Sequence, residues 1–132
     1  MIVLDTHVLI WWATGDAQLS AKARHAIAAQ QRNSGHILVS AITAWEIAML
    51  IERDRIVLTM DVDEWLAAVQ GFDGVRMVPV SPRVAVQSVR LPGTFHKDPA
   101  DRMIVALARE MNAPLLTADT KIHDYPHVRC IW

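Results

Sequence analysis

The feature that most constrains the fold is the alternation of short apolar runs with longer segments of helical periodicity. The apolar runs predict five strands, at residues 2–4, 37–39, 75–80, 114–117 and 128–132. The segments between them predict helices at residues 6–12, 20–32, 40–50, 61–69, from 81 onwards, and 98–111. Strands separated by helices favour a parallel sheet that is covered on both faces. We therefore expect an α/β fold of three layers, with a parallel sheet of about five strands flanked by helices.

Length and composition fit one water-soluble domain. A chain of 132 residues is long enough for a core of its own, and we expect a single domain over residues 1–132. The hydrophobic fraction of 52% and the charged fraction of 20% are those of an ordinary globular protein. The net charge of -1 supplies no overall attraction for polyanions. This counts mildly against nucleic-acid binding, but it does not exclude a local basic patch.

The sequence offers few signals for targeting, membrane insertion or disulfide formation. No run approaches the ~20 apolar residues of a membrane span, and the first ten residues, interrupted by Asp5, are too short for a signal peptide. The single cysteine, Cys130, has no partner for an internal disulfide and lies in an apolar run, so we interpret it as a packing residue. These features predict a cytoplasmic protein with no membrane partner.

Acidic residues fall at related places in the predicted fold. Asp5 directly follows the first strand, and Asp119 follows the strand at 114–117. Asp101 lies in the first turn of the helix that opens at Asp98, and Glu46 lies one to two turns into an apolar helix. Ligands of such folds bind beyond the carboxyl ends of the strands. We therefore expect these acids to be candidates for one common site.

A cluster of these carboxylates needs something that offsets their mutual repulsion. Two carboxylates about 4 Å apart repel each other by roughly 4 kcal/mol at an effective dielectric constant near 20. No basic residue close in sequence to Asp5 or Glu46 is placed to compensate. Hard oxygen ligands, without Cys or paired His, favour Mg²⁺ or Mn²⁺ over zinc. Two such ions are a common apparatus for phosphodiester cleavage.

Most of these acids also have a purely structural interpretation. Asp98, before a proline, is a typical N-cap, and Asp101 would favourably face the positive end of the same helix. Asp5 and Asp119 could cap the segments that follow them. Glu46 has the weakest structural explanation, because an apolar setting makes an unpaired carboxylate costly. The cluster is not specific to one reaction.

Four segments of the chain carry a more specific pattern. They are Met1–His7, a strand that ends in Asp-Thr; Ser40–Ile47, which contains Glu46; Phe95–Ala106, with its His-x-Asp-Pro sequence; and Leu115–Asp119. In this order they resemble the four motifs of PIN-domain ribonucleases, in particular the VapC-type toxins of bacterial toxin–antitoxin pairs. Any one motif would be a weak signal, but four in order across the whole chain are specific.

The resemblance implies both a site and an activity. Asp5, Glu46, Asp101 and Asp119 would hold Mg²⁺ or Mn²⁺ and carry catalysis, and Asp98 would be an accessory acid. The protein would be a metal-dependent endoribonuclease that hydrolyses RNA phosphodiester bonds with metal-activated water. It would act as a toxin, form a homodimer, and be inhibited by a cognate antitoxin protein in a hetero-oligomer.

Three further residues and two other functions stay open on the sequence. Arg102 could contact RNA phosphate, or equally form an ion pair with Asp98 four residues earlier. His96 could contact phosphate or order its loop, and His7 is interpreted as a packing or loop histidine. The other functions are a non-catalytic PIN-type binding module and a Mg²⁺-dependent receiver or phosphatase-like domain. The latter would need a Lys at a later strand end, and Lys121 fits that role poorly because we expect it in a loop.

Overall fold

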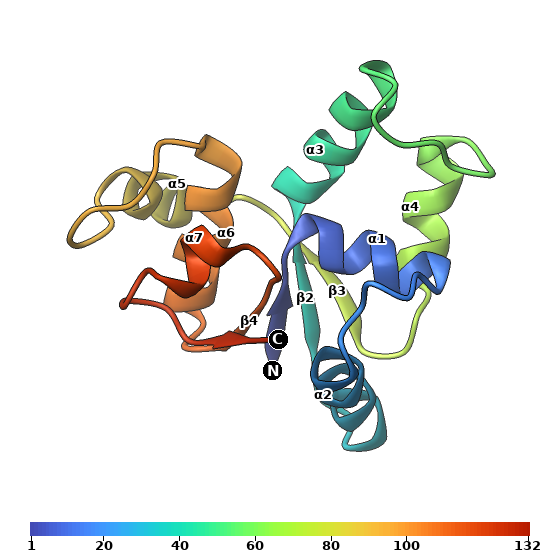
Figure 1. Ribbon diagram of the computed structural model, residues 1–132, viewed down its shortest axis with the longest axis horizontal. Helices are drawn as coiled ribbons and strands as arrows, with labels where there is room; N and C mark the ends of the chain where they lie inside the picture. The colour runs from blue at the N-terminus through green and yellow to red at the C-terminus, as the bar shows by residue number, and fades with distance from the viewer.

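The computed structural model describes all residues from 1 to 132, in five strands and seven helices (Figure 1). The strands are β1 (Ile2–Leu4), β2 (Ile37–Ser40), β3 (Val75–Val78), β4 (Leu115–Leu116) and β5 (Cys130–Ile131). The helices are α1 (Thr6–Thr14), α2 (Ala21–Arg32), α3 (Ala41–Glu52), α4 (Val62–Gln70), α5 (Pro82–Val89), α6 (Pro99–Glu110) and α7 (Thr120–His123).

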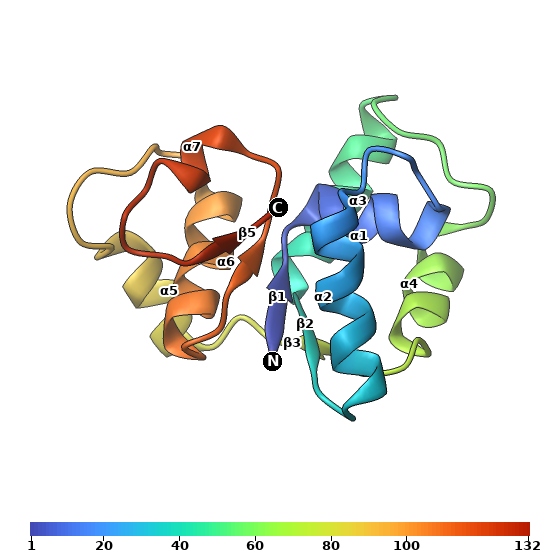
Figure 2. The ribbon, with the colours of Figure 1, turned by 60° about the horizontal axis from the view of Figure 1, so that its bottom comes forward.

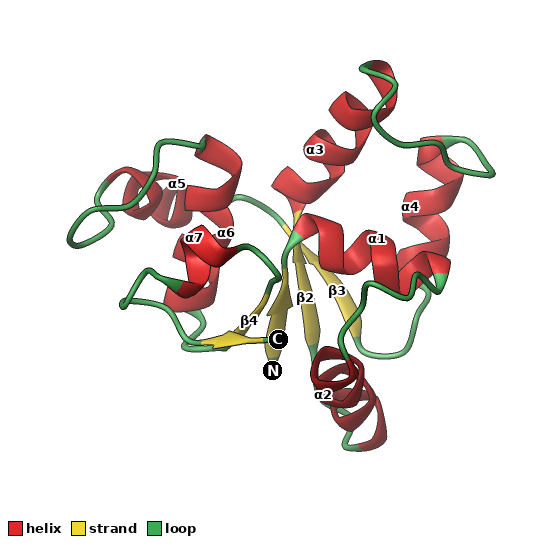
Figure 3. Ribbon diagram, viewed as in Figure 1, coloured by secondary structure: helices red, strands yellow, loops and turns green.

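Every pair of neighbouring strands is parallel, and the strand order is β3-β2-β1-β4-β5. Helices α1, α2 and α4 lie on one side of the sheet, and α5, α6 and α7 lie on the other (Figures 2 and 3). The prediction of a three-layer α/β fold with a five-stranded parallel sheet is thereby confirmed.

Each face of the sheet has its own hydrophobic core. Ile2 and Leu4 of β1 belong to the core beneath α1, α2 and α4, whereas Val3 belongs to the core beneath α5 and α6. This separation follows from the alternation of side chains along a strand. All residues of β1 and β2 are buried, as expected for strands covered on both faces.

The topology creates a crevice at one defined place. The chain adds β2 and β3 on one side of β1, and later adds β4 and β5 on its other side. Where successive connections reverse in this way, the loops that leave the two central strands separate, and ligands bind between them. Asp5 directly follows β1 and Asp119 lies three residues beyond β4, so both flank this crevice.

Strand β1 has the predicted bounds and β2 is one residue longer than predicted, whereas β3, β4 and β5 are shorter. Strand β3 ends at Val78 rather than at Val80, because Pro79 has no N–H for the ladder. Strands β4 and β5 comprise two residues each. Helix α1 continues to Thr14, where Gly15 ends it in a left-handed conformation. The four-residue helix α7 was not predicted, since it is too short to show a helical period.

The expectation that much of the helix after Ser40 is buried is wrong. In α3 only Thr43 and Ile47 are buried, and Trp45 is 52% exposed. The cause is position, because α3 extends beyond the carboxyl ends of the strands instead of lying along the sheet (Figure 1). None of the helices has the length and apolar content that crossing a membrane requires.

Candidate active site

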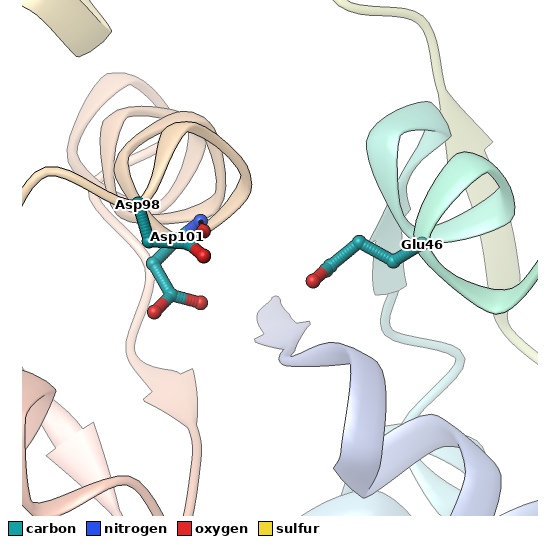
Figure 4. Close-up of side chains that lie close together, drawn as sticks. All are labelled: Glu46, Asp98 and Asp101. Atoms are coloured by element: carbon teal, nitrogen blue, oxygen red, sulfur yellow. Dashed lines mark hydrogen bonds between the residues drawn. The ribbon is translucent and has the colours of Figure 1, made fainter. Parts of the chain in front are cut away.

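The predicted acids meet at the carboxyl edge of the sheet. Asp5, Glu46, Asp101 and Asp119 all line one cavity of about 240 Å³. Glu46 extends from α3 toward Asp98, just before α6, and Asp101 in its first turn (Figure 4), and these three offer carboxylate oxygens that lie within 4.8 Å of one another. A larger cavity of about 610 Å³, next to α5 and α6, has no acidic residue in its lining. The acidic lining of the cavity therefore identifies the candidate site, and the volume of the cavity does not.

Three of the acids also cap helices, so the structural interpretation is confirmed for them. The side chain of Asp5 accepts from the N–H of Thr6 at 2.8 Å and caps α1. Asp98 and Asp119 cap α6 and α7, each accepting at 2.9 Å from a backbone N–H. Each of these caps uses one carboxylate oxygen. Capping therefore fixes the direction of the carboxylate and leaves the second oxygen for other partners.

Three buried threonines orient the acids, and sequence reasoning did not identify them as site residues. Thr117 donates to Oδ2 of Asp5 at 2.6 Å, and Thr6 donates to Oε1 of Glu46. The hydroxyl of Thr43, which is fully buried, lies 3.0 Å from that of Thr6. Thr43 and Thr6 are 37 residues apart, and Thr117 and Asp5 are 112 apart, so no local pattern reveals these pairs.

The site carries uncompensated negative charge. Arg83–Glu110 joins an arginine to an acid away from the site, and the two close contacts of site carboxylates, His7–Asp5 and His96–Asp101, involve histidines, so no Lys or Arg neutralises a site carboxylate. Burial raises the pKa of Asp101 to about 8, and the carboxylates of Asp5, Asp98, Glu46 and Asp119 add to this effect. Burial also raises the pKa of Glu46, against the opposing effect of the hydrogen bond from Thr6. Oxygen donors under mutual repulsion fit a hard divalent cation, which would relieve it.

Arg102 has a structural role that the sequence did not suggest. Its guanidinium donates to the carbonyl oxygens of Ser88, Phe95 and His96 at 2.8–3.1 Å, and to that of Val89 at 3.4 Å. It forms no ion pair with Asp98, so that alternative is wrong. Its contact with RNA stays a prediction, but its donors are already occupied in joining the end of α5 to the loop before α6.

The two histidines of the site each face an acid. Nε2 of His96 lies 2.9 Å from Oδ2 of Asp101, but the contact lacks hydrogen-bond alignment, so this buried nitrogen has no hydrogen-bond partner. His7 lies in the first turn of α1, and its Nδ1 is 3.6 Å from Oδ2 of Asp5. Its interpretation as a packing or loop residue therefore misses its place beside Asp5. Phosphate contact by His96 stays a prediction.

A parallel sheet in this order, with acids gathered at its switch point, defines the class of PIN-domain nucleases. The model of the PIN domain family matches residues 2–128, and the chain belongs to this family. It is also 38% identical, over 128 residues, to "Ribonuclease VapC22" of Mycobacterium tuberculosis, a match that covers 97% of this chain and 94% of that protein. The resemblance to VapC-type PIN domains seen in the sequence is thereby confirmed. Membership of this family also excludes the receiver-like alternative.

Solved structures show the same fold at lower identity. A toxin-antitoxin complex from Klebsiella pneumoniae gives a TM-score of 0.67 at 21% identity, over 97% of this chain and 95% of that one. A DNA-bound VapBC structure from Salmonella typhimurium gives 0.65 at 21% identity, over 98% and 97%. A further structure, VapC20 of Mycobacterium tuberculosis, described as a sarcin-ricin loop cleaving toxin, gives 0.62 at 19% identity, over 98% and 99%.

Proposed function

We propose that this protein is an endoribonuclease that uses Mg²⁺ or Mn²⁺, bound by its acidic cluster, to hydrolyse RNA phosphodiester bonds. As a member of the VapC ribonuclease family, it is a ribonuclease toxin of a toxin–antitoxin system. The single observation that carries the metal dependence is a cavity lined by four carboxylates that no Lys or Arg neutralises.

The acids of the site would have two roles, binding of the cation and accessory support. Asp5, Glu46, Asp101 and Asp119 would hold the cation, with Asp98 as an accessory acid at the rim. When bound, the cation would activate the attacking water and neutralise charge on the phosphoryl oxygens.

Neighbouring groups would keep the acids in position. The backbone N–H of Thr6 and the hydroxyl of Thr117 hold both oxygens of Asp5. The Thr6 hydroxyl donates a hydrogen bond to one carboxylate oxygen of Glu46. Side chains fixed by such outer contacts lose little conformational freedom when a ligand binds.

The partners we propose follow from the family. One similar structure is described as a toxin-antitoxin complex and another as a DNA-bound VapBC, which supports pairing of this chain with an antitoxin protein that covers the site. Because cellular RNA is the proposed substrate, we place its action in the cytoplasm. Formation of a homodimer stays a prediction.

Cleavage of a panel of cellular RNAs by the purified, antitoxin-free protein tests this function. The reactions contain Mg²⁺, Mn²⁺ or EDTA, and use the wild type, Asp5→Asn and Asp54→Asn. Asn preserves the capping of α1 but removes the charge of the carboxylate, and Asp54 is an exposed acid that does not line the cavity. We expect discrete, metal-dependent cuts that Asp5→Asn abolishes and Asp54→Asn leaves unchanged. Cleavage that persists in EDTA, or in Asp5→Asn, would overturn the proposal.

A further inference from the structure

His7 contributes to the site through both ring nitrogens. It lines the same cavity as Asp5 and Asp119. Its Nε2 accepts a hydrogen bond from the backbone N–H of Ala118 at 3.0 Å, while its Nδ1 faces Oδ2 of Asp5 at 3.6 Å. A neutral imidazole has one donor and one acceptor nitrogen. Because Nε2 accepts, the proton of the ring lies on Nδ1, on the side of Asp5.

Aromatic neighbours restrict the orientation of this ring. The His7 ring centroid lies 4.9 Å from that of Trp11, one turn later in α1, and 6.4 Å from that of Trp132. The two indoles are themselves 5.7 Å apart. The imidazole therefore packs against two indoles from opposite ends of the sequence, which also contact each other, and these contacts favour one orientation of the ring.

The hydrogen bond to Ala118 acts on the loop that carries Asp119. Residues 117–119 are joined to the segment at Asp5–His7 at two consecutive points, through the Thr117 hydroxyl and the Ala118 N–H. Both contacts lie immediately before Asp119. A Lys or Arg at position 7 would offer no acceptor and would add a permanent positive charge among the acids. A neutral histidine supplies the acceptor without that charge.

We propose that His7 is a positioning residue, which fixes the Asp119 loop against the Asp5 segment through an imidazole held in the Nδ1–H tautomer. The proposal deepens the proposed function and rests on its metal site. Its effect is on the distance between two acids that would share a cation, so metal affinity reports it directly.

The tautomer is tested without any metal. Ring-nitrogen NMR of ¹⁵N-labelled wild-type protein at neutral pH should show a protonated Nδ1 and an unprotonated, accepting Nε2 for His7. Comparison with His7→Gln assigns the signals. A protonated Nε2, or an average over both tautomers, would overturn the proposal.

The positioning role is tested by Mn²⁺ affinity, measured on folded protein by EPR of the free ion. His7→Gln keeps a carbonyl oxygen that can accept from Ala118, whereas His7→Asn is too short to reach it and His7→Leu has no acceptor. We expect Leu and Asn to weaken Mn²⁺ binding about tenfold or more, and Gln to stay within about threefold of the wild type. His25→Gln, on an exposed position of α2, is the matched control and should bind Mn²⁺ like the wild type.

Two results would refute the positioning role: unchanged Mn²⁺ affinity in His7→Leu and His7→Asn, or a loss in His7→Gln as large as theirs. Should His7→Leu fail to fold, His7→Asn and His7→Gln still decide the question. A wild-type protein that binds no Mn²⁺ would refute the proposed metal site instead, and this result is distinguishable because the wild type is measured first.

Discussion

Asp101 should make the metal-free protein less stable as the pH rises, and Asp101→Asn should remove this effect. Burial and the neighbouring carboxylates raise the pKa of this carboxyl from its ordinary value of 3.8 to about 8 in the folded protein. Between these values the folded state keeps a proton that the unfolded state has lost. Stability therefore falls as pH increases through this window, by up to about 1.4 kcal/mol per pH unit. Below the window both states are protonated, and the penalty vanishes.

The magnitude at neutral pH follows from the same slope. The interval of roughly three pH units between the ordinary pKa of the carboxyl and pH 7 corresponds to an upper bound of about 4 kcal/mol. The Asp101 side chain is 17% exposed, so solvent screens part of this penalty. We expect Asp101→Asn to be about 2 kcal/mol more stable than the wild type at neutral pH in EDTA, or roughly 6–10 °C in Tm for a domain of this size.

Urea denaturation in EDTA at a series of pH values measures this difference. The gap in unfolding free energy between Asp101→Asn and the wild type should widen from about pH 5 to about pH 7. Added Mn²⁺ should stabilise the wild type and leave Asp101→Asn nearly unchanged. Asp54→Asn should follow the wild type throughout. Parallel pH curves for the wild type and Asp101→Asn, or a less stable Asp101→Asn in EDTA, would refute the electrostatic reasoning.

Other predictions address the reaction and the scaffold. Cleaved RNA should carry 5′-phosphate and 3′-hydroxyl ends, since metal-dependent hydrolysis needs no ribose 2′-hydroxyl; end-labelling that detects 2′,3′-cyclic phosphate would contradict this. Glu46→Gln should lose cleavage while keeping its fold, as followed by RNA gels and circular dichroism, and an active Glu46→Gln would exclude a metal-holding role. Arg102→Ala should lower the unfolding free energy by about 2–3 kcal/mol, because its hydrogen bonds to backbone carbonyls are lost; weaker RNA binding at unchanged stability would instead favour phosphate contact. Cys130, whose thiol pKa burial raises to about 11, should react with a thiol reagent at neutral pH only after unfolding.

Local signals predict the elements and the acids well. Apolar runs give the centres of all five strands, and capping residues such as Ser20, Ser40 and Ser81 give the starts of three helices. The acids at strand and helix ends were identifiable because cap positions and carboxyl edges are properties of short segments. Three of the five proved to be caps as well, so the two interpretations described the same side chains.

Tertiary placement explains what the sequence did not predict. The role of Thr43 depends on contact with Thr6, 37 residues away, and the role of His7 depends on Ala118, 111 residues away. Neither pair has a signature in the sequence. The burial of α3 was predicted wrongly, because its apolar composition carries no information about its position beyond the sheet.

The strand order also determines at which point during synthesis of the polypeptide the acidic site can form. Strand β1 is made first and ends in Asp5, but its neighbour β4 and the Asp119 loop are made near the end of the chain. A growing polypeptide that has reached Glu110 already contains Asp5, Glu46, Asp98 and Asp101, yet one side of β1 is still unpaired. Asp5 then lacks its hydrogen bond from Thr117, and Asp119 does not yet line the cavity. The four-acid site can therefore form only after the segment that carries β4, Thr117 and Asp119 has been synthesised.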